Sequence, residues 1–315
     1  MTELEINRHN ALIDPHLAVW GWEIPVYLFL GGLAAGIMIL AALAARRPAA
    51  ERALVARLTP FAAPVVLSLG MLALFLDLHA RLHVFRFYTA LRLTAPMSWG
   101  AWILLAIYPA AILLGLAGLT AAELDRALAW RPVAALRLGG LARGAHAFAA
   151  RHGAGLRVTN VALGAALGVY TGILLSNLGA RAAWSSALLG PLFLVSGVSA
   201  GAAFLMLFPL SHDEHRLLRR WDLAAIGLEV ALLLLYLFAL ATSAGAGGQQ
   251  AAALFLGGRF TAPFWSLVVI AGLAVPLVLE LVEARRGLKP TLVAPALVLA
   301  GGLALRVIVV LAGQA

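Results

Sequence analysis

The sequence predicts an all-α integral membrane protein whose eight transmembrane helices leave both termini on one side of the membrane. Of its 315 residues, 63% are hydrophobic and only 12% are charged, and the mean hydropathy is +0.96. A single water-soluble core could not bury so much apolar surface. Eight apolar stretches have the length of about 20 residues that a helix needs to cross a bilayer. They lie near residues 22–45, 59–78, 98–120, 158–178, 186–210, 223–243, 263–282 and 291–312.

Residues 1–21 form the predicted N-terminal segment, and residues 22–312 form the transmembrane domain. The first apolar stretch differs from a cleavable signal peptide, because an acidic, His-bearing segment precedes it and the basic pair Arg46-Arg47 follows it. A secretory signal peptide carries its positive charge on the N-terminal side of its apolar segment. We therefore expect this helix to stay in the mature protein.

The basic residues of the loops predict the orientation. If the eight helices alternate in direction, the termini and the loops near 79–97, 179–185 and 244–262 share one side and contain six Arg residues. The loops on the other side contain sixteen Arg or Lys residues. Because retained positive charge marks the cytoplasmic face, both termini are predicted to be periplasmic, in a bacterial inner membrane.

Composition excludes several other kinds of site. The chain has no cysteine, so it offers no thiolate for an iron–sulfur cluster and no attachment point for covalent haem. The formal net charge is +9, but the basic residues are dispersed over short loops, which argues against nucleic-acid binding. Any such redox centre must belong to a partner protein, and the main environment of this chain is the lipid bilayer.

A short internal repeat predicts two four-helix halves, at residues 22–178 and 186–312. Residues 25–36 (PVYLFLGGLAAG) and 191–201 (PLFLVSGVSAG) each begin with a proline, have an aromatic residue two positions later and continue with small residues. Parallel repeats of this kind occur in several membrane folds.

The glycines of the two repeat segments have the spacing of a helix-packing motif. Gly32 with Gly36, and Gly197 with Gly201, are four residues apart, so each pair lies on one helix face. Small residues at this spacing let two backbones approach closely in lipid. Helix packing is their simplest predicted role.

The long loop at residues 121–157 is predicted to be cytoplasmic. It mixes Arg with Ala and Leu, which favours an amphipathic helix on the membrane surface over a ninth span. Pro132 and Gly139-Gly140 would interrupt such a helix.

Polar residues within the spans are few, and most lie near the predicted periplasmic ends. A charged group at the bilayer centre costs about 2.5–3.5 kcal/mol on insertion scales, so each needs a partner or a task. If the bundle brought these residues together, the charges would pair, and Tyr, His and Asn could hydrogen-bond a planar apolar ligand such as a quinone. The candidates are Glu23 and Tyr27 on the first helix, Asp77 and His79 on the second, Ser98 and Trp99 on the third, Tyr170 and Asn177 on the fourth and Arg306 on the eighth.

A structural role for these residues stays open. Arg306 and Asp77 could be a buried ion pair that locks helices together, and side chains near the span ends could extend to water. His79 and His83 share a helix face that could hold a metal or haem, but no other predicted span carries a histidine. Interfacial hydrogen bonding is favoured, and we expect no metal site.

A second polar group lies in the cytoplasmic half. Glu229 lies inside the sixth predicted helix and Glu280 in the seventh, and Thr159 and Asn160 enter the fourth at comparable depth. Together they predict a partial proton route. The alternative is that the acidic residues Glu280, Glu283 and Asp222 only solvate the boundary beside the basic loops.

Four segments carry a family resemblance that spans essentially the whole sequence. They are residues 20–36 (WGWEIPVYLFLGGLAAG), residues 77–102 (DLHAR leading to APMSWGAW), residues 170–176 (YTGILLS) and residues 301–314 (GGLALR leading to AGQ). In these segments the protein resembles the NrfD/PsrC (polysulfide reductase NrfD) family of membrane subunits.

The resemblance implies a quinone-binding subunit that anchors a periplasm-facing respiratory oxidoreductase and is not an enzyme by itself. It implies menaquinone or ubiquinone as the ligand, and electron exchange with a ferredoxin-like iron–sulfur subunit on the periplasmic face. A molybdenum or multihaem cytochrome subunit would complete the complex. The absence of cysteine from this sequence is consistent with a complex in which a partner subunit holds the iron–sulfur clusters.

Site roles follow from the same resemblance. The polysulfide reductase branch uses an Asn and a His on the first helix to contact quinone, whereas this sequence has Glu23, Ile24 and Tyr27 there; Tyr170 in its Tyr-Thr-Gly setting matches the family better. The candidate catalytic residues are Asp77, His79 and Tyr170, and the candidate quinone contacts are Glu23, Tyr27, Trp99, Asn177 and Arg306.

Two rival functions stay open. A secondary transporter would also suit an internal repeat with charged residues inside the spans. A passive membrane anchor without quinone chemistry is the other alternative.

Overall fold

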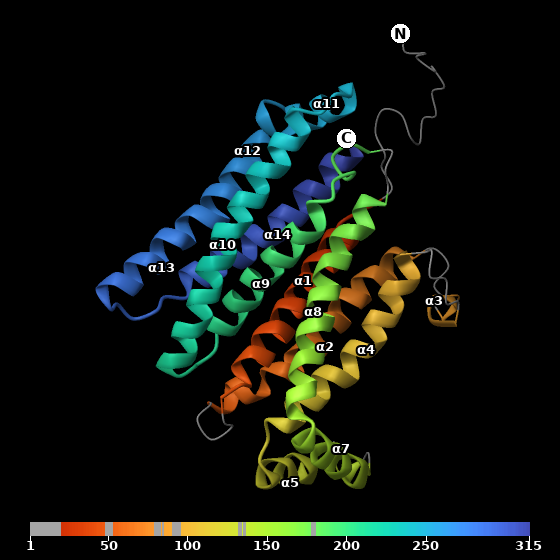
Figure 1. The fold of residues 1–315 in the computed structure, drawn as a ribbon, viewed down its shortest axis with the longest axis vertical. Coiled ribbons are helices and arrows are strands. Elements are labelled where there is room, and N and C mark those ends of the chain that lie inside the picture. The colour runs from red at the N-terminus through yellow and green to blue at the C-terminus, as the bar shows by residue number, and fades with distance from the viewer. Residues whose placement is uncertain are drawn as a thin grey trace.

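The described part of the chain folds into helices, eight of which have the length and composition of membrane spans. The computed structural model describes residues 20–47, 53–78, 83, 85–89, 96–131, 134, 137–177 and 181–315, and these residues contain helices but no strand. Eight helices are long and apolar enough to cross a membrane, which confirms the predicted fold class (Figure 1). They are α1 (Glu23–Ala44), α2 (Leu54–Asp77), α4 (Pro96–Ala117), α8 (Gly153–Ser176), α9 (Leu189–Met206), α10 (His212–Ala241), the continuous helix of α12 (Thr261–Pro263), η3 (Phe264–Ala274) and α13 (Val275–Arg286), and α14 (Val293–Gln314).

The helix α10 begins eleven residues before the predicted start of its span at residue 223. A capping box explains the earlier start. The Glu214 N–H donates to Ser211 Oγ, and the Ser211 N–H donates to Glu214 Oε2 at 2.9 Å. These bonds satisfy backbone groups that a helix start leaves free. Hydropathy thus located the lipid-embedded part of the helix, whereas the cap decides where the helix begins.

The spans pack as two four-helix bundles (Figure 1). In the first bundle, α1 packs against α2 and α8, and α4 closes the ring between them. In the second, α9 packs against α10 and α14, and the α12–η3–α13 helix closes the ring. The two bundles meet where α1 packs against α9 and α14, and where α8 packs against α9.

A glycine seam joins α1 to α9. A Cβ atom added at Gly36 would lie 2.0 Å from the Gly197 carbonyl oxygen, and one added at Gly201 would lie 2.6 Å from the Gly36 carbonyl carbon. The backbones of the two helices are therefore in direct contact, as small residues four apart permit. The predicted packing role of these glycines is confirmed.

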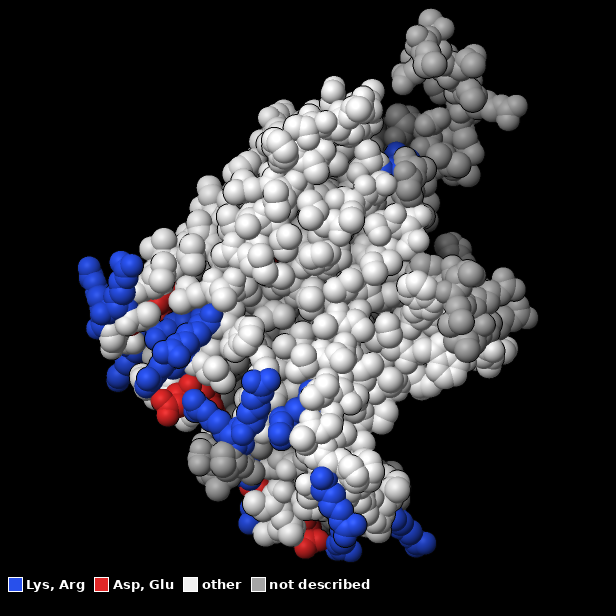
Figure 2. Space-filling model, viewed as in Figure 1, with Lys and Arg blue, Asp and Glu red and all other residues white. Residues whose placement is uncertain are grey.

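The two ends of the molecule are chemically different. The Trp20 N–H donates to Gln314 Oε1 at 2.9 Å, and Gln314 Nε2 donates to the Trp20 carbonyl at 3.0 Å. These bonds place both limits of the membrane domain at one end, which we call the terminal end. Lys and Arg side chains gather at the opposite end, which we call the basic end (Figure 2). They include Arg46, Arg47, Arg216, Arg220, Arg285, Arg286 and Lys289.

In the described part of the predicted loop at residues 121–157, two helices precede α8 where one was predicted. They are α5 (Ala121–Ala129) and α7 (Gly139–Arg151), at the basic end (Figure 1). Residues 137–138 are not helical, so the helix is interrupted directly before the Gly139-Gly140 pair, which begins α7, while Pro132 lies outside the described residues. Two further helices outside the spans, α3 (Arg86–Thr89) and α11 (Ala246–Leu256), had no predicted counterpart.

The start of α5 is held by Glu123. Its carboxylate accepts hydrogen bonds from the Thr120 N–H and hydroxyl at 2.8 and 2.9 Å, and from the Arg57 guanidinium at 2.7 Å. The Thr120 backbone N–H, its hydroxyl and Arg57 together hold the pKa of Glu123 below its ordinary value of 4.5. The Arg57 contact fixes α5 against the start of α2.

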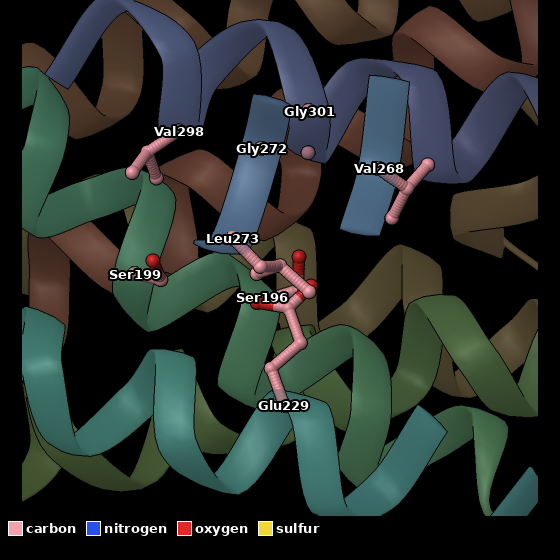
Figure 3. Close-up of a pocket in the computed structure, with 9 residues that line it drawn as sticks. Ser196, Ser199, Glu229, Val268, Gly272, Leu273, Val298 and Gly301 are labelled. Carbon is pink, nitrogen blue, oxygen red and sulfur yellow. The ribbon is translucent and has the colours of Figure 1, made fainter. Parts of the chain in front are cut away.

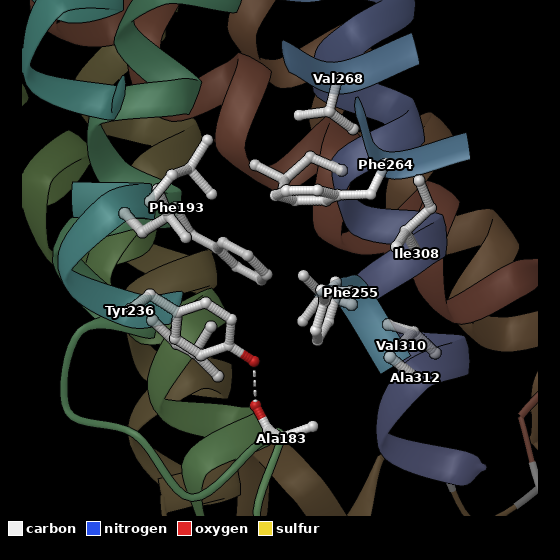
Figure 4. Packing of buried hydrophobic residues seen from close by; sticks show 14 of the residues in the cluster. Ala183, Phe193, Tyr236, Phe255, Phe264, Val268, Ile308, Val310 and Ala312 are labelled. Atoms are coloured by element: carbon white, nitrogen blue, oxygen red, sulfur yellow. Dashed lines mark hydrogen bonds between the residues drawn. The ribbon is translucent and has the colours of Figure 1, made fainter. Parts of the chain in front are cut away.

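Aromatic side chains close the second bundle toward the terminal end (Figure 4). Phe255 of α11 lies between Tyr236 and Phe264, with ring centroids 6.2 and 5.3 Å away. The Tyr236 hydroxyl donates to the Ala183 carbonyl, so its polar atom is satisfied although the residue is buried. These residues and Phe193 belong to one apolar cluster.

Candidate functional site

Two buried tyrosines mark the first bundle near the terminal end. Tyr27 of α1 is 3% exposed and Tyr170 of α8 is 6% exposed. Each lies within about two turns of the terminal end of its helix. Their phenol groups are close enough to interact electrostatically, and Tyr88 of α3 also interacts with Tyr27. Two buried phenols thus lie near the terminal end of the first bundle, close enough to influence each other electrostatically.

One glycine makes room for the Tyr170 ring, and another glycine lies beside Tyr27. A Cβ atom at Gly100 of α4 would lie 1.9 Å from the Tyr170 hydroxyl oxygen, and one at Gly70 of α2 would lie 3.8 Å from Tyr27 Cδ2. All four helices of the first bundle therefore contribute to the surroundings of the two phenols. A side chain at Gly100 would displace Tyr170.

Other predicted site residues lie at the same end of the first bundle. Asp77 is the last residue of α2 and is half-buried, and Glu23 is the first residue of α1 and is also half-buried. Trp99 of α4 is 43% exposed. Asn177 follows α8 and is exposed, and its Nδ2 donates to the Ile173 carbonyl of the same helix at 2.8 Å. His79 lies outside the described residues.

Arg306 lies on α14 of the second bundle, and its guanidinium faces Gly32 of α1 at the junction of the two bundles. The residue is 1% exposed. Its guanidinium donates to Ser196 Oγ, to the Gly302 carbonyl at 3.2 Å and to the Phe193 carbonyl at 3.0 Å. The guanidinium carbon also lies 4.7 Å from the centre of the Phe193 ring. Arg306 is therefore held by α9 and by its own helix.

The predicted pairing of Arg306 with Asp77 or Glu23 is wrong. Among the described residues, no ion pair includes Arg306, and the carboxylate whose charge acts on it is Glu229 of α10. The reason is topological. The helix α14 packs mainly against η3, α9 and α1, whereas α2 packs against α1 and α4.

A series of polar groups runs through the second bundle. Ser196 Oγ accepts a hydrogen bond from Arg306, and Ser196 also lies close to the buried Glu229. One turn along α9, Ser199 donates to Asp222 Oδ1. Ser196, Ser199 and Glu229 line a narrow gap that has no room for a water molecule (Figure 3). The rest of its lining is Val268, Gly272, Leu273, Val298, Gly301 and Gly302.

The acidic residues near the basic end are buried, so the interpretation that they only solvate the boundary is wrong. Asp222 is 0% exposed, Glu280 is 2% exposed and Glu283 is 6% exposed. Glu283 accepts hydrogen bonds from the Thr291 N–H at 3.0 Å and hydroxyl at 2.7 Å. Their positions close to basic loops in the sequence did not reveal that α9, α10 and α14 cover them.

Asn160 and Glu229, predicted as one proton route, lie in different bundles. Asn160 Nδ2 donates to the Ala110 carbonyl of α4 at 2.9 Å and to the Leu156 carbonyl of its own helix at 2.8 Å. The side chain thus ties α8 to α4. No hydrogen bond between described residues joins it to Glu229.

Comparisons with known proteins place the protein in a family. Residues 10–315 match the family described as Polysulphide reductase, NrfD. The chain belongs to this NrfD family. The C subunit of polysulfide reductase from Wolinella succinogenes is 30% identical over 310 residues, covering 94% of each of the two proteins. Protein NrfD of Escherichia coli K12 is 30% identical over 308 residues, covering 94% of this protein and 95% of the relative.

A third member of the NrfD family is similar over a shorter region. The NrfD homolog of Haemophilus influenzae is 33% identical over 126 residues, which is 37% of this protein and 38% of the relative. The family resemblance seen in the sequence motifs is confirmed. Sequence reasoning missed Gly100, Tyr88, Ser196 and Ser199. Their signals were weak, since single Gly, Ser and Tyr residues are common in spans.

Proposed function

We propose that this NrfD-family protein is the quinone-binding membrane anchor of a respiratory oxidoreductase complex. The observation that carries the proposal is the pair of buried phenols, Tyr27 and Tyr170, at the terminal end of the first bundle. A phenol can donate a hydrogen bond to a quinone carbonyl, and apolar neighbours favour the quinone ring. The Wolinella relative is, by its name, one subunit of a larger enzyme, which supports a role within a complex.

Each residue of this site has a distinct proposed task. Menaquinone or ubiquinone, when bound, would accept or release two electrons and two protons. Tyr170 and Tyr27 would orient the head group through their hydroxyls, and Trp99 would cover it from the lipid side. Asp77, half-buried at the end of α2, would exchange protons with the solvent at the terminal end. His79 and Glu23 would assist this exchange.

The proposed partner is a ferredoxin-like iron–sulfur subunit that docks at the terminal end. The sequence has no cysteine with which to hold a cluster, so electrons must come from or go to a partner. The tyrosines lie nearer to the terminal end than to the basic end, which favours docking there. A molybdenum or multihaem cytochrome subunit would carry the chemistry of the terminal substrate.

The proposed orientation puts the terminal end in the periplasm of a bacterial inner membrane, because the basic end carries the retained positive charge (Figure 2). Alkaline phosphatase fused after Ala315 is therefore expected to be active, and the same reporter inserted after Gly287 is expected to be inactive. Reporter activities in cells expressing the full-length protein test this. The reverse pattern would overturn the orientation.

Asp77→Asn and Tyr170→Phe are each expected to lower quinone-linked turnover by about tenfold or more, the scale of general acid–base contributions. Both changes conserve shape, so assembly of the complex and its activity with artificial redox dyes should stay unchanged. Turnover of the purified complex with a quinol analogue is the measurement. Tyr108→Phe is a matched control, because Tyr108 lies deeper in α4 and its hydroxyl contacts Ser68 at 3.0 Å. Wild-type quinone turnover in both Asp77→Asn and Tyr170→Phe would contradict the proposal.

A secondary transporter is less well supported. The buried charges of the second bundle would suit one, but the gap beside Ser196 and Glu229 has no room for a solute. A passive anchor would bind no quinone, so the two substitutions would leave quinone turnover unchanged. The same turnover measurement therefore distinguishes a passive anchor from the proposed function.

A further inference from the structure

Two buried carboxyl groups face each other in the second bundle. Asp222 lies on α10 and Glu280 on α13, and the two side chains are within hydrogen-bonding reach of one another. Both are almost fully buried, at 0% and 2% exposed. This pair plays no part in the proposed quinone site, which lies in the other bundle.

The hydrogen bonds of this pair are incomplete. Ser199 Oγ donates to Asp222 Oδ1, but Asp222 Oδ2 and both carboxylate oxygens of Glu280 have no donor. An ionised carboxylate can only accept hydrogen bonds. Two ionised carboxylates at this distance would repel each other, and neither would receive the donor that its buried oxygens need. One proton on either group removes one charge and lets two of these three oxygens share a hydrogen bond.

We propose that Asp222 and Glu280 form a proton-binding site that holds one shared proton between them. The bound proton makes one carboxyl the donor and the other the acceptor. No covalent bond other than O–H forms or breaks, and the proton returns to water when it leaves. The proposal stands independently of the proposed quinone chemistry.

The charged and polar groups around the pair come from every helix that packs on it. On α10, Arg219 lies one turn nearer the basic end and interacts with Glu280, and His215 lies one turn beyond that. On α13, Glu283 lies one turn nearer the basic end. Arg219 forms no ion pair among the described residues, so it offsets part of the negative charge without replacing the shared proton. From α9, Ser199 donates to Asp222, and from α14 the charge of Arg306 acts on Glu229, about 10 Å farther along α10.

The shared proton is expected to exchange with the basic end. Glu283 lies between Glu280 and the end of α13, where Arg285 and Arg286 are exposed, and it contacts Thr291 in the following loop. Toward the terminal end, the aromatic cluster closes the bundle (Figure 4). The polar route therefore leads from the pair to the basic end.

Infrared spectroscopy of the full-length protein in lipid nanodiscs tests the proposal. A buried protonated carboxyl gives a carbonyl stretching band that shifts on H/D exchange. The wild type is expected to show one such band, which disappears as the pH is raised. Glu280→Gln and Asp222→Asn should each abolish it, because the new amide supplies the donor and the remaining carboxylate needs no proton. Glu123→Gln, at the start of α5, should leave the band unchanged.

Several outcomes would overturn the proposal. These are a wild type without the band, a band that survives both substitutions in monodisperse protein, and a band that disappears when sodium ions replace choline at constant pH. The sodium result would mean that a metal cation occupies the site in place of a proton. Because each single variant retains a donor–acceptor pair, both are expected to fold, and the wild-type spectrum decides the matter even if one does not. Quinone turnover is not part of this test, so failure here leaves the proposed function unaffected.

Discussion

Replacing Gly36 with leucine is expected to separate the two bundles and to leave little folded protein. The first atom of the new side chain would lie 2.0 Å from the Gly197 carbonyl oxygen and 3.1 Å from Gly201 Cα. Both obstacles are backbone, so no rotamer change can relieve the clash. Overpacking usually costs about 1–3 kcal/mol of stability. Because the clash is with backbone, we expect a cost at or above the upper limit of this range. After extraction of the variant in mild detergent, the loss is expected to appear as a smaller monodisperse fraction in size-exclusion chromatography and as a lower Tm.

A matched control is available in the same membrane domain. Gly227 lies on α10 with nothing within 4 Å of an added Cβ atom, and it is exposed on the outer surface of the bundle. Gly227→Leu is expected to behave like the wild type, because the new side chain would face lipid. Gly197→Leu should reproduce the Gly36→Leu defect from the other side of the seam. If Gly36→Leu and Gly227→Leu give equal yields, α1 and α9 do not pack as described.

Arg306→Gln is expected to have the second large effect, on the stability of the folded protein. The substitution removes charged hydrogen bonds to Ser196 and to the Phe193 carbonyl, and it leaves the buried Glu229 without its positive neighbour. Removing one partner of a buried charged pair typically costs about 3–5 kcal/mol. Since Arg306 and Glu229 form no direct ion pair among the described residues, the lower part of that range is expected. Thermal unfolding of the purified protein measures it.

A double substitution isolates the electrostatic part of this effect. Arg306→Gln combined with Glu229→Gln should recover part of the lost stability, because the second change removes the stranded carboxylate. Coupling energies between neighbouring groups are commonly about 0.5–3 kcal/mol. Arg143→Gln, which breaks an exposed ion pair with Asp125, should change stability by no more than about 1 kcal/mol. Strict additivity of the Arg306 and Glu229 effects would show that the two groups do not interact.

Parts of the fold were readable from the sequence because they depend on local properties. The length and hydropathy of each stretch predicted all eight spans, since a helix in lipid needs a continuous apolar run. The spacing of Gly36, Gly197 and Gly201 predicted a close helix contact, because glycine is small wherever its partner lies. The start of α10 was missed, since its first three turns lie outside the apolar run and depend on the Ser211 cap.

The position of a residue along its span was also readable, and it was sufficient for the tyrosines. Tyr27 and Tyr170 were expected at one depth near one end, and the structure places both in the first bundle. For Arg306, the same reasoning gave a wrong prediction. Arg306 was expected to pair with Asp77 because both lie at a similar depth in the membrane. Two residues at one height can belong to different bundles, and only the arrangement of the helices decides which of them are neighbours.

The sequence by itself determined the membrane environment, the number of spans, the end of the molecule that carries positive charge and the family to which the protein belongs. Only the tertiary structure decided which helix face is buried and which side chains meet across helices. Asp222 and Glu280 illustrate the physical reason. They lie 58 positions apart in the sequence and near basic loops, and their burial follows from helices that pack over them. Hydropathy measures each residue's preference for lipid or water, whereas the meeting of two carboxyl groups is a property of the packed bundle.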